Sequence, residues 1–269
     1  MISAAVLAPV ALFCMWVGGW PWMALVVAGG LAMGMEWAEI IGLRSHASPG
    51  MVLPLVGALA GFEAAAGQTA DALATVVVFA VVAWWLARRS DAGRSALTPR
   101  GLGRKATGRW AAGGVAYIGV AIVALCLLRG LGREMLVFLV VVVWASDIGA
   151  YAVGRLAGGR KLAPSISPGK TWSGAFGGLG AAVVVGWLLA AVAGVPGRWG
   201  VAAAAGVLAV ASQVGDLFES WVKRQFGVKD SGWLIPGHGG VLDRLDGVLA
   251  AAPAGVVLAW VMLGGGVWR

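Results

Sequence analysis

The chain has 269 residues, of which 60% are apolar and only 12% are charged. Soluble domains contain about 25% charged residues, so this chain cannot cover its apolar surface with polar groups and is expected to lie in a lipid bilayer. The net charge of +8 would suit nucleic acid, but the basic residues fall between apolar stretches and not in one arm. We therefore expect no nucleic acid partner.

Nine apolar stretches are long enough, or nearly so, to cross a hydrocarbon core of about 30 Å. In chain order they cover residues 2–18, 20–41, 51–66, 69–87, 110–128, 134–154, 173–195, 199–221 and 246–268. The expected fold is an all-α, polytopic membrane bundle of about nine transmembrane helices. No Lys or Arg precedes the first stretch, unlike a cleaved secretory signal, so we expect that stretch to be retained as a span.

The long basic loop 88–109 divides the chain into N-terminal transmembrane helices, residues 1–87, and a C-terminal catalytic region, residues 110–269. If that loop faces the cytoplasm, alternation of nine spans places 16 Lys and Arg residues inside and 4 outside. This asymmetry predicts a cytoplasmic position for the N-terminus and for loops 42–50, 88–109, 155–172 and 222–245.

The four apolar stretches before that loop contain few acidic residues, which are Glu36, Glu39, Glu63 and Asp71. After the loop, acidic residues recur at membrane depth or beside it. We therefore expect the chemistry to lie after residue 140.

The most informative segment is DLFESWVKRQFGVKDSGWLIPGHGGVLDRLD, residues 216–246. Asp216, Ser220 and Lys223 follow helical spacing at the end of the eighth stretch, and Asp243 and Asp246 are three apart at the start of the ninth. Carboxylates at membrane depth need a partner. Together with the basic residues Lys223, Arg224, Lys229 and Arg244, three carboxylates suit a Mg²⁺–triphosphate complex. Salt bridges that close the helix ends are the alternative.

A second segment, SISPGKTWSG at residues 165–174, places Ser167, Lys170 and Thr171 before the seventh stretch. Backbone N–H groups at a helix start, with a Lys and hydroxyls, indicate an anion site, and an ordinary helix cap is the alternative. It is not a P-loop, because Pro164 stands where that motif requires glycine.

A third segment, WASDIGAYAVGR at residues 144–155, carries Asp147 near the end of an apolar span. An acid so placed is a candidate site residue. A structural ion pair with Arg155 or Arg160 is the alternative.

The segment from Ser220 to Asp246 resembles the signature of the phosphatidate cytidylyltransferases, and the Asp147 and Ser-Pro-x-Lys-Thr segments stand where that family also has motifs. The resemblance covers the C-terminal half, whereas the first four spans resemble the family only in hydropathy. Gly169 and Ser173 stand where the family often has a basic and an acidic residue.

The resemblance implies transfer of a cytidylyl group from CTP to phosphatidate by a multi-span homodimer of the bacterial inner membrane, with the active site facing the cytoplasm. It also implies one or two Mg²⁺ ions, and a monovalent cation is compatible with it. The expected metal ligands are Asp216, Asp243 and Asp246, and Lys223 joins them as a catalytic candidate. The substrate-binding candidates are Asp147, Ser167, Lys170, Thr171, Ser220, Arg224, Lys229, Asp230, His238 and Arg244.

Two other functions are compatible with the same residues. A transporter also carries intramembrane acids, but it would place them near the bilayer midplane, whereas here they gather at one membrane face. A related transferase could act on an isoprenoid phosphate or an ether lipid. His238 could contact a phosphate or order the loop. Ordering of the loop is favoured, because phosphatidate is already an anionic nucleophile and the reaction does not obviously need a catalytic proton transfer.

Overall fold

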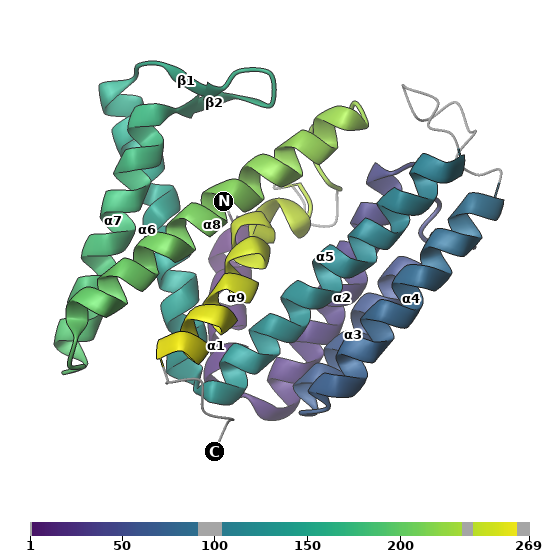
Figure 1. Cartoon of the computed structure of the whole chain (residues 1–269), viewed down its shortest axis with the longest axis horizontal. Helices are drawn as coiled ribbons and strands as arrows, with labels where there is room; N and C mark the ends of the chain where they lie inside the picture. The colour runs from purple at the N-terminus through teal and green to yellow at the C-terminus, as the bar shows by residue number, and fades with distance from the viewer. Residues whose placement is uncertain (1, 91–103, 233–238, 263–269) are drawn as a thin grey trace. The chain divides into compact units, whose positions relative to one another are not determined.

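The computed structural model describes residues 2–90, 104–232 and 239–262. Within these ranges the chain forms nine α-helices and one short antiparallel hairpin (Figure 1). The helices are α1 (Ile2–Val17), α2 (Gly19–Ile40), α3 (Val52–Ala65), α4 (Thr69–Arg89), α5 (Arg104–Leu131), α6 (Arg133–Ala157), α7 (Trp172–Val192), α8 (Arg198–Gln225) and α9 (Leu242–Met262). Each of the nine apolar stretches thus corresponds to one helix, and the prediction of a helical fold is confirmed.

Seven of the helices in the described part, α2 and α4 to α9, are long and apolar enough to cross a membrane. The other two, α1 and α3, have 16 and 14 residues. At a rise of 1.5 Å per residue α3 is about 21 Å long, which is less than the hydrocarbon core of about 30 Å. The chain is therefore built as a multi-pass membrane protein with at least two apolar helices below the usual spanning length.

The chain divides into two compact units. The first unit contains Met1–Arg133 and Val222–Leu245, and the second contains Glu134–Trp221 and Asp246–Arg269. The signature segment therefore contributes to both units, since α8 passes from the second to the first and α9 returns to the second.

In the first unit, helices α2 to α5 pack through small residues. A side chain on Gly30 would collide with the backbone of Gly57, so α2 and α3 approach closely at this point. Gly114 of α5 faces the indole of Trp37, which is 1% exposed and donates a hydrogen bond to the carbonyl of Trp110 at 3.0 Å. The resulting core holds α2, and with it the acidic residue that precedes Trp37, in a fixed place.

Glycines also set the helix contacts in the second unit. Gly149 of α6 lies against Gly177 and Gly178 of α7, and Gly186 of α7 lies against Ala205 of α8. The hairpin of β1 (Lys161–Ala163) and β2 (Ser167–Thr171) connects α6 to α7 (Figure 1). The segment expected as a loop and helix start is thus largely a β-strand, because the two strands pair in the short connection before α7 begins.

Candidate active site

The end of α8 carries the first cluster of candidate residues, which lies in the second unit. The ammonium of Lys170, on β2, forms an ion pair with Oδ2 of Asp216. The hydroxyl of Ser220, one turn further along α8, donates to Oδ1 of Asp216 at 3.5 Å. Lys170 and Asp216 are therefore brought together from segments 46 positions apart, which spacing alone could not establish.

Asp246 lies on the helix that packs against the same part of α8. A Cβ atom on Gly215 would meet the carbonyl oxygen of Asp246 and the side chain of Ala250. One turn earlier, Ser212 lies against Gly247 in the same way. Since Gly215 directly precedes Asp216, the close approach of α8 and α9 brings the backbones that carry Asp216 and Asp246 near each other.

Asp147 is exposed on α6, and its charge relates it to the same cluster. Its carboxylate interacts electrostatically with Asp216 and with Lys170. Arg155, one of the two proposed structural partners, instead donates a hydrogen bond to the Tyr151 hydroxyl at 2.7 Å. The position of Asp147 thus favours a role with Lys170 and Asp216 over a pair with Arg155.

Thr171 ends strand β2 and caps helix α7. Its hydroxyl accepts a hydrogen bond from the Gly174 backbone N–H at 3.1 Å, and it lies 3.0 Å from the Ser173 hydroxyl. The Ser173 hydroxyl in turn donates to the Gly158 carbonyl. Thr171 therefore orders the junction of hairpin and helix, as the helix-cap alternative expected, while Ser167 lies half-buried at the other end of β2.

Lys223 and Asp243 form the second cluster, which lies in the first unit. The ammonium of Lys223 binds Oδ1 of Asp243 at 2.6 Å, and the two side chains are 11% and 10% exposed. The backbone N–H groups of Ser231 and Gly240 both donate to Oδ2 of Asp243 at 2.9 Å. Each carboxylate oxygen thus has a donor. We call the described residues between α8 and α9, 226–232 and 239–241, the signature loop, and Asp243 ties this loop to the start of α9.

Glu36 on α2 contacts the same loop, although the sequence analysis set it aside with the other acids before residue 140. Its carboxylate accepts hydrogen bonds from the backbone N–H groups of Val241 and Leu242, both at 2.8 Å. The rule that an acid at membrane depth marks a site would have selected Glu36. Nothing in the sequence links Glu36 to residues 241–242, so its contact with them could not be predicted.

The remaining candidates lie around these clusters. Arg224, Lys229, Asp230 and Arg244 are exposed, and the Arg224 guanidinium donates to the Val228 carbonyl at 3.3 Å. The expectation for His238 lies outside the described residues.

Carboxylate oxygens are the ligands that Mg²⁺ prefers, so the donor chemistry of these aspartates fits the ion. In the described ranges, no three Asp, Glu, His or Cys side chains converge as a metal-binding group. Lysine ammonium groups instead neutralise Asp216 and Asp243. These two carboxylates therefore already attract cations, and binding of a metal ion would require each lysine to move away.

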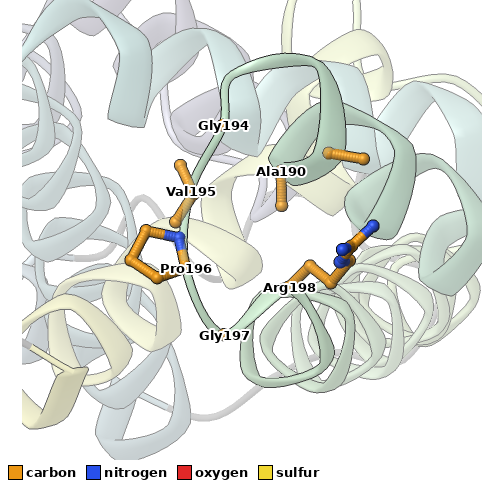
Figure 2. Close-up of a pocket in the computed structure, with 7 residues that line it drawn as sticks. Ala190, Gly194, Val195, Pro196, Gly197 and Arg198 are labelled. Carbon is orange, nitrogen blue, oxygen red and sulfur yellow. The ribbon is translucent and has the colours of Figure 1, made fainter.

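A hollow of about 270 Å³ lies at the turn between α7 and α8, lined by Ala190, Ala191 and residues 194–198 (Figure 2). Arg198 is the only charged residue of that lining, and none of the candidate residues contributes to it. It lies at the opposite end of α7 from the β1–β2 hairpin, so within the second unit it is separate from the cluster of Lys170 and Asp216.

Comparison with known proteins decides the family. The sequence pattern of the cytidylyltransferase family matches residues 1–262. The chain belongs to the cytidylyltransferase family. The resemblance found in the signature segment is thus confirmed, and the family match also includes the first four helices, for which only hydropathy had indicated it.

Two of the relatives described below match nearly the whole chain, and a third matches less than half of it. A protein of Brucella suis biovar 1 (strain 1330), named phosphatidate cytidylyltransferase, is 44% identical over 259 residues, covering 94% of this chain and 89% of its own length. A Pseudomonas aeruginosa protein of the same name is 36% identical over 282 residues, covering 97% and 96%. A third, from Haemophilus influenzae, is 46% identical over 127 residues, covering 45% and 44%.

Proposed function

We propose that this protein condenses CTP with phosphatidate to give CDP-diacylglycerol and pyrophosphate, as a step of phospholipid biosynthesis. The observation that carries the proposal is the 44% identity over 94% of the chain to a protein named phosphatidate cytidylyltransferase. The charged clusters at the ends of α8 and α9 suit this chemistry, since they combine carboxylates with cations.

The reaction needs positioning and charge neutralisation more than proton transfer. An oxygen of the phosphatidate phosphate attacks the α-phosphorus of CTP, the bond to the β-phosphate breaks, and pyrophosphate leaves with the electron pair. The nucleophile is already anionic near neutral pH, so no strong general base is required. Because two anions must approach in line, cations placed around them supply most of the rate enhancement.

We propose that Lys170 and Lys223 supply that charge. Each ammonium now contacts a carboxylate, Asp216 and Asp243 respectively. When the triphosphate binds, we propose that both ammonium groups turn to its oxygens, which leaves the two carboxylates available for another cation. Exposed Arg224, near the end of α8, is a further candidate for the β- or γ-phosphate.

We propose that Asp216, Asp243 and Asp246 hold Mg²⁺, as one or two ions. Bound there, Mg²⁺ would neutralise the developing charge on the phosphate oxygens. The close approach of α8 and α9 at Gly215 supports the assignment for Asp216 and Asp246. The three-residue spacing of Asp243 and Asp246 in α9 supports it for Asp243, because residues so spaced share one face of a helix.

We further propose nine spans, location in the bacterial inner membrane and a site that faces the cytoplasm. Helices α5 to α8 are all long enough to cross, so loops 88–109, 155–172 and 222–245 would lie on one side. These loops carry most of the Lys and Arg residues, which favours the cytoplasmic side. The homodimer is proposed from the family resemblance alone.

The test uses purified protein in detergent with CTP and phosphatidate, and it follows pyrophosphate and CDP-diacylglycerol. Both products should form in equal amounts with Mg²⁺, and EDTA should abolish turnover until Mg²⁺ is restored in excess. If turnover occurs only with an isoprenoid phosphate, the lipid substrate is that phosphate and not phosphatidate. No product with any lipid, together with gradient-driven transport in vesicles, would overturn the enzymatic proposal.

A further inference from the structure

Glu36 is the one residue of the first four helices whose side chain reaches the signature loop through several hydrogen bonds in the described ranges. It is 1% exposed, and its two oxygens accept from the Val241 and Leu242 N–H groups at 2.8 Å. A third donor is the Ser231 hydroxyl, 3.3 Å from Oε2. All of these residues belong to the first unit.

The bonds to Val241 and Leu242 satisfy the start of α9. The first N–H groups of a helix have no intrahelical partner, and a carboxylate there also meets the positive end of the helix dipole. A buried charge is costly unless it is hydrogen-bonded, so the three donors explain how Glu36 can remain buried. The start of α9 is consequently tied to α2, some 200 positions earlier in the chain.

Ser231 extends this connection to Asp243. Its hydroxyl donates to Glu36 and accepts from the Asp243 N–H at 3.3 Å, while its own N–H donates to the Asp243 carboxylate at 2.9 Å. Asp243 then binds the Lys223 ammonium at 2.6 Å. A continuous network thus runs from Glu36 through Ser231 and Asp243 to Lys223.

Two glycines of the loop fit closely around the same carboxylate. A Cβ atom on Gly240 would collide with the Ser231 hydroxyl and with Oε2 of Glu36, and one on Gly232 would lie 2.9 Å from Cγ of Glu36. Gly232 and Gly240, one on each side of the undescribed residues 233–238, therefore both lie directly against the Glu36 side chain.

We propose that Glu36 is a positioning residue for the reaction: through Ser231 and the start of α9 it fixes the Asp243 carboxylate in the place from which it holds Lys223 until the triphosphate binds. The inference rests on the proposed function, since it assigns Asp243 and Lys223 to cytidylyl transfer. Glu36 touches no substrate in this account and acts only through the loop. This role also explains why α2, which carries no other candidate site residue, has a buried acid at position 36.

Glu36→Gln keeps the size of the side chain but replaces one acceptor oxygen by a donor, so one of the two backbone N–H groups loses its partner. We expect kcat per folded protein to fall at least about tenfold, which corresponds to 1.4 kcal/mol, with a smaller change in KM for CTP. Glu39→Gln is the matched control, because Glu39 is exposed on the same helix and its carboxylate accepts a hydrogen bond from the nearby Ser45 hydroxyl.

Ser231→Ala and the double variant with Glu36→Gln test whether the two residues act through one network. If they do, the double variant should lose little more activity than the more damaged single variant. Losses that multiply, or a kcat of Glu36→Gln within about twofold of Glu39→Gln, would overturn the proposal. A purely structural role would reduce the yield of folded protein and leave kcat per folded molecule unchanged.

Hydrogen exchange separates this inference from the proposed function. In Glu36→Gln the amides of residues 239–243 should exchange faster than in the unmodified protein, whether or not CTP is turned over. If exchange rises in Glu36→Gln but the unmodified protein shows no turnover, the proposed function fails and Glu36 still holds the loop. If exchange is unchanged, Glu36 does not hold the loop and the inference is wrong.

Discussion

Replacement of Asp243 by Asn tests the Lys223–Asp243 pair most directly, because the effects on stability and on turnover can be compared in one variant. The Asn carbonyl can still accept from the Ser231 and Gly240 N–H groups, which both meet Oδ2. The Asn amide then faces the Lys223 ammonium, where Oδ1 now accepts at 2.6 Å. The variant thus keeps the loop contacts but removes the negative charge that the Lys223 ammonium contacts.

The magnitude follows from burial of the pair. Lys223 and Asp243 are 11% and 10% exposed, so solvent does little to compensate the remaining charge. Removal of one partner from a buried pair costs about 3–5 kcal/mol. Lys223→Met should cost a similar amount, because it leaves the carboxylate unpaired. The double variant removes both charges and should recover most of that loss in stability.

The assay measures stability and turnover on the same samples. Unfolding by SDS in mixed micelles gives the relative free energy of unfolding, and pyrophosphate release gives kcat. We expect both single variants to be destabilised and the double variant to approach the parent, while turnover falls at least about a hundredfold in all three. Normal turnover in Asp243→Asn would refute a role for the pair in catalysis.

Two further changes test the second unit. Lys170→Met should lower kcat/KM for CTP at least about tenfold with little loss of stability, since its pair with Asp216 is partly exposed, and Lys161→Met on the neighbouring strand should behave as the parent. An unchanged KM and kcat would remove Lys170 from the phosphate site. Gly215→Ala should lower the free energy of unfolding by about 1–3 kcal/mol and reduce turnover, because the added methyl group separates α8 from α9. Gly180→Ala is the control, because nothing lies within 4 Å of the added methyl group, and it should reduce neither stability nor turnover. Equal effects of the two alanines would contradict the close helix approach.

Much of the fold could be predicted from the sequence because hydrophobic length determines which segments can be buried in lipid. Each apolar stretch corresponds to a helix, and the helical spacing of Asp216, Ser220 and Lys223 is realised in α8. The β1–β2 hairpin escaped prediction, because SISPGKT combines turn residues with no alternation of apolar and polar positions.

Which candidate residues lie close together could be predicted only for residues three or four positions apart on one helix. The pairing of Lys170 with Asp216 joins a strand to a helix, and the contact of Glu36 with Val241 and Leu242 spans over 200 positions. Both depend on tertiary packing of glycine-rich helices, which a periodic pattern does not specify. Long-range contacts of this kind had to come from the structure.

In the proposed reaction the α-phosphorus of CTP is transferred to the lipid. Parallel reactions of the purified protein with phosphatidate and either α-labelled or γ-labelled CTP, followed by chloroform extraction, test this transfer. We expect the α-label to enter the lipid phase in proportion to the pyrophosphate formed, while the γ-label stays in water. Appearance of the γ-label in the lipid, or absence of the α-label from it, would refute cytidylyl transfer.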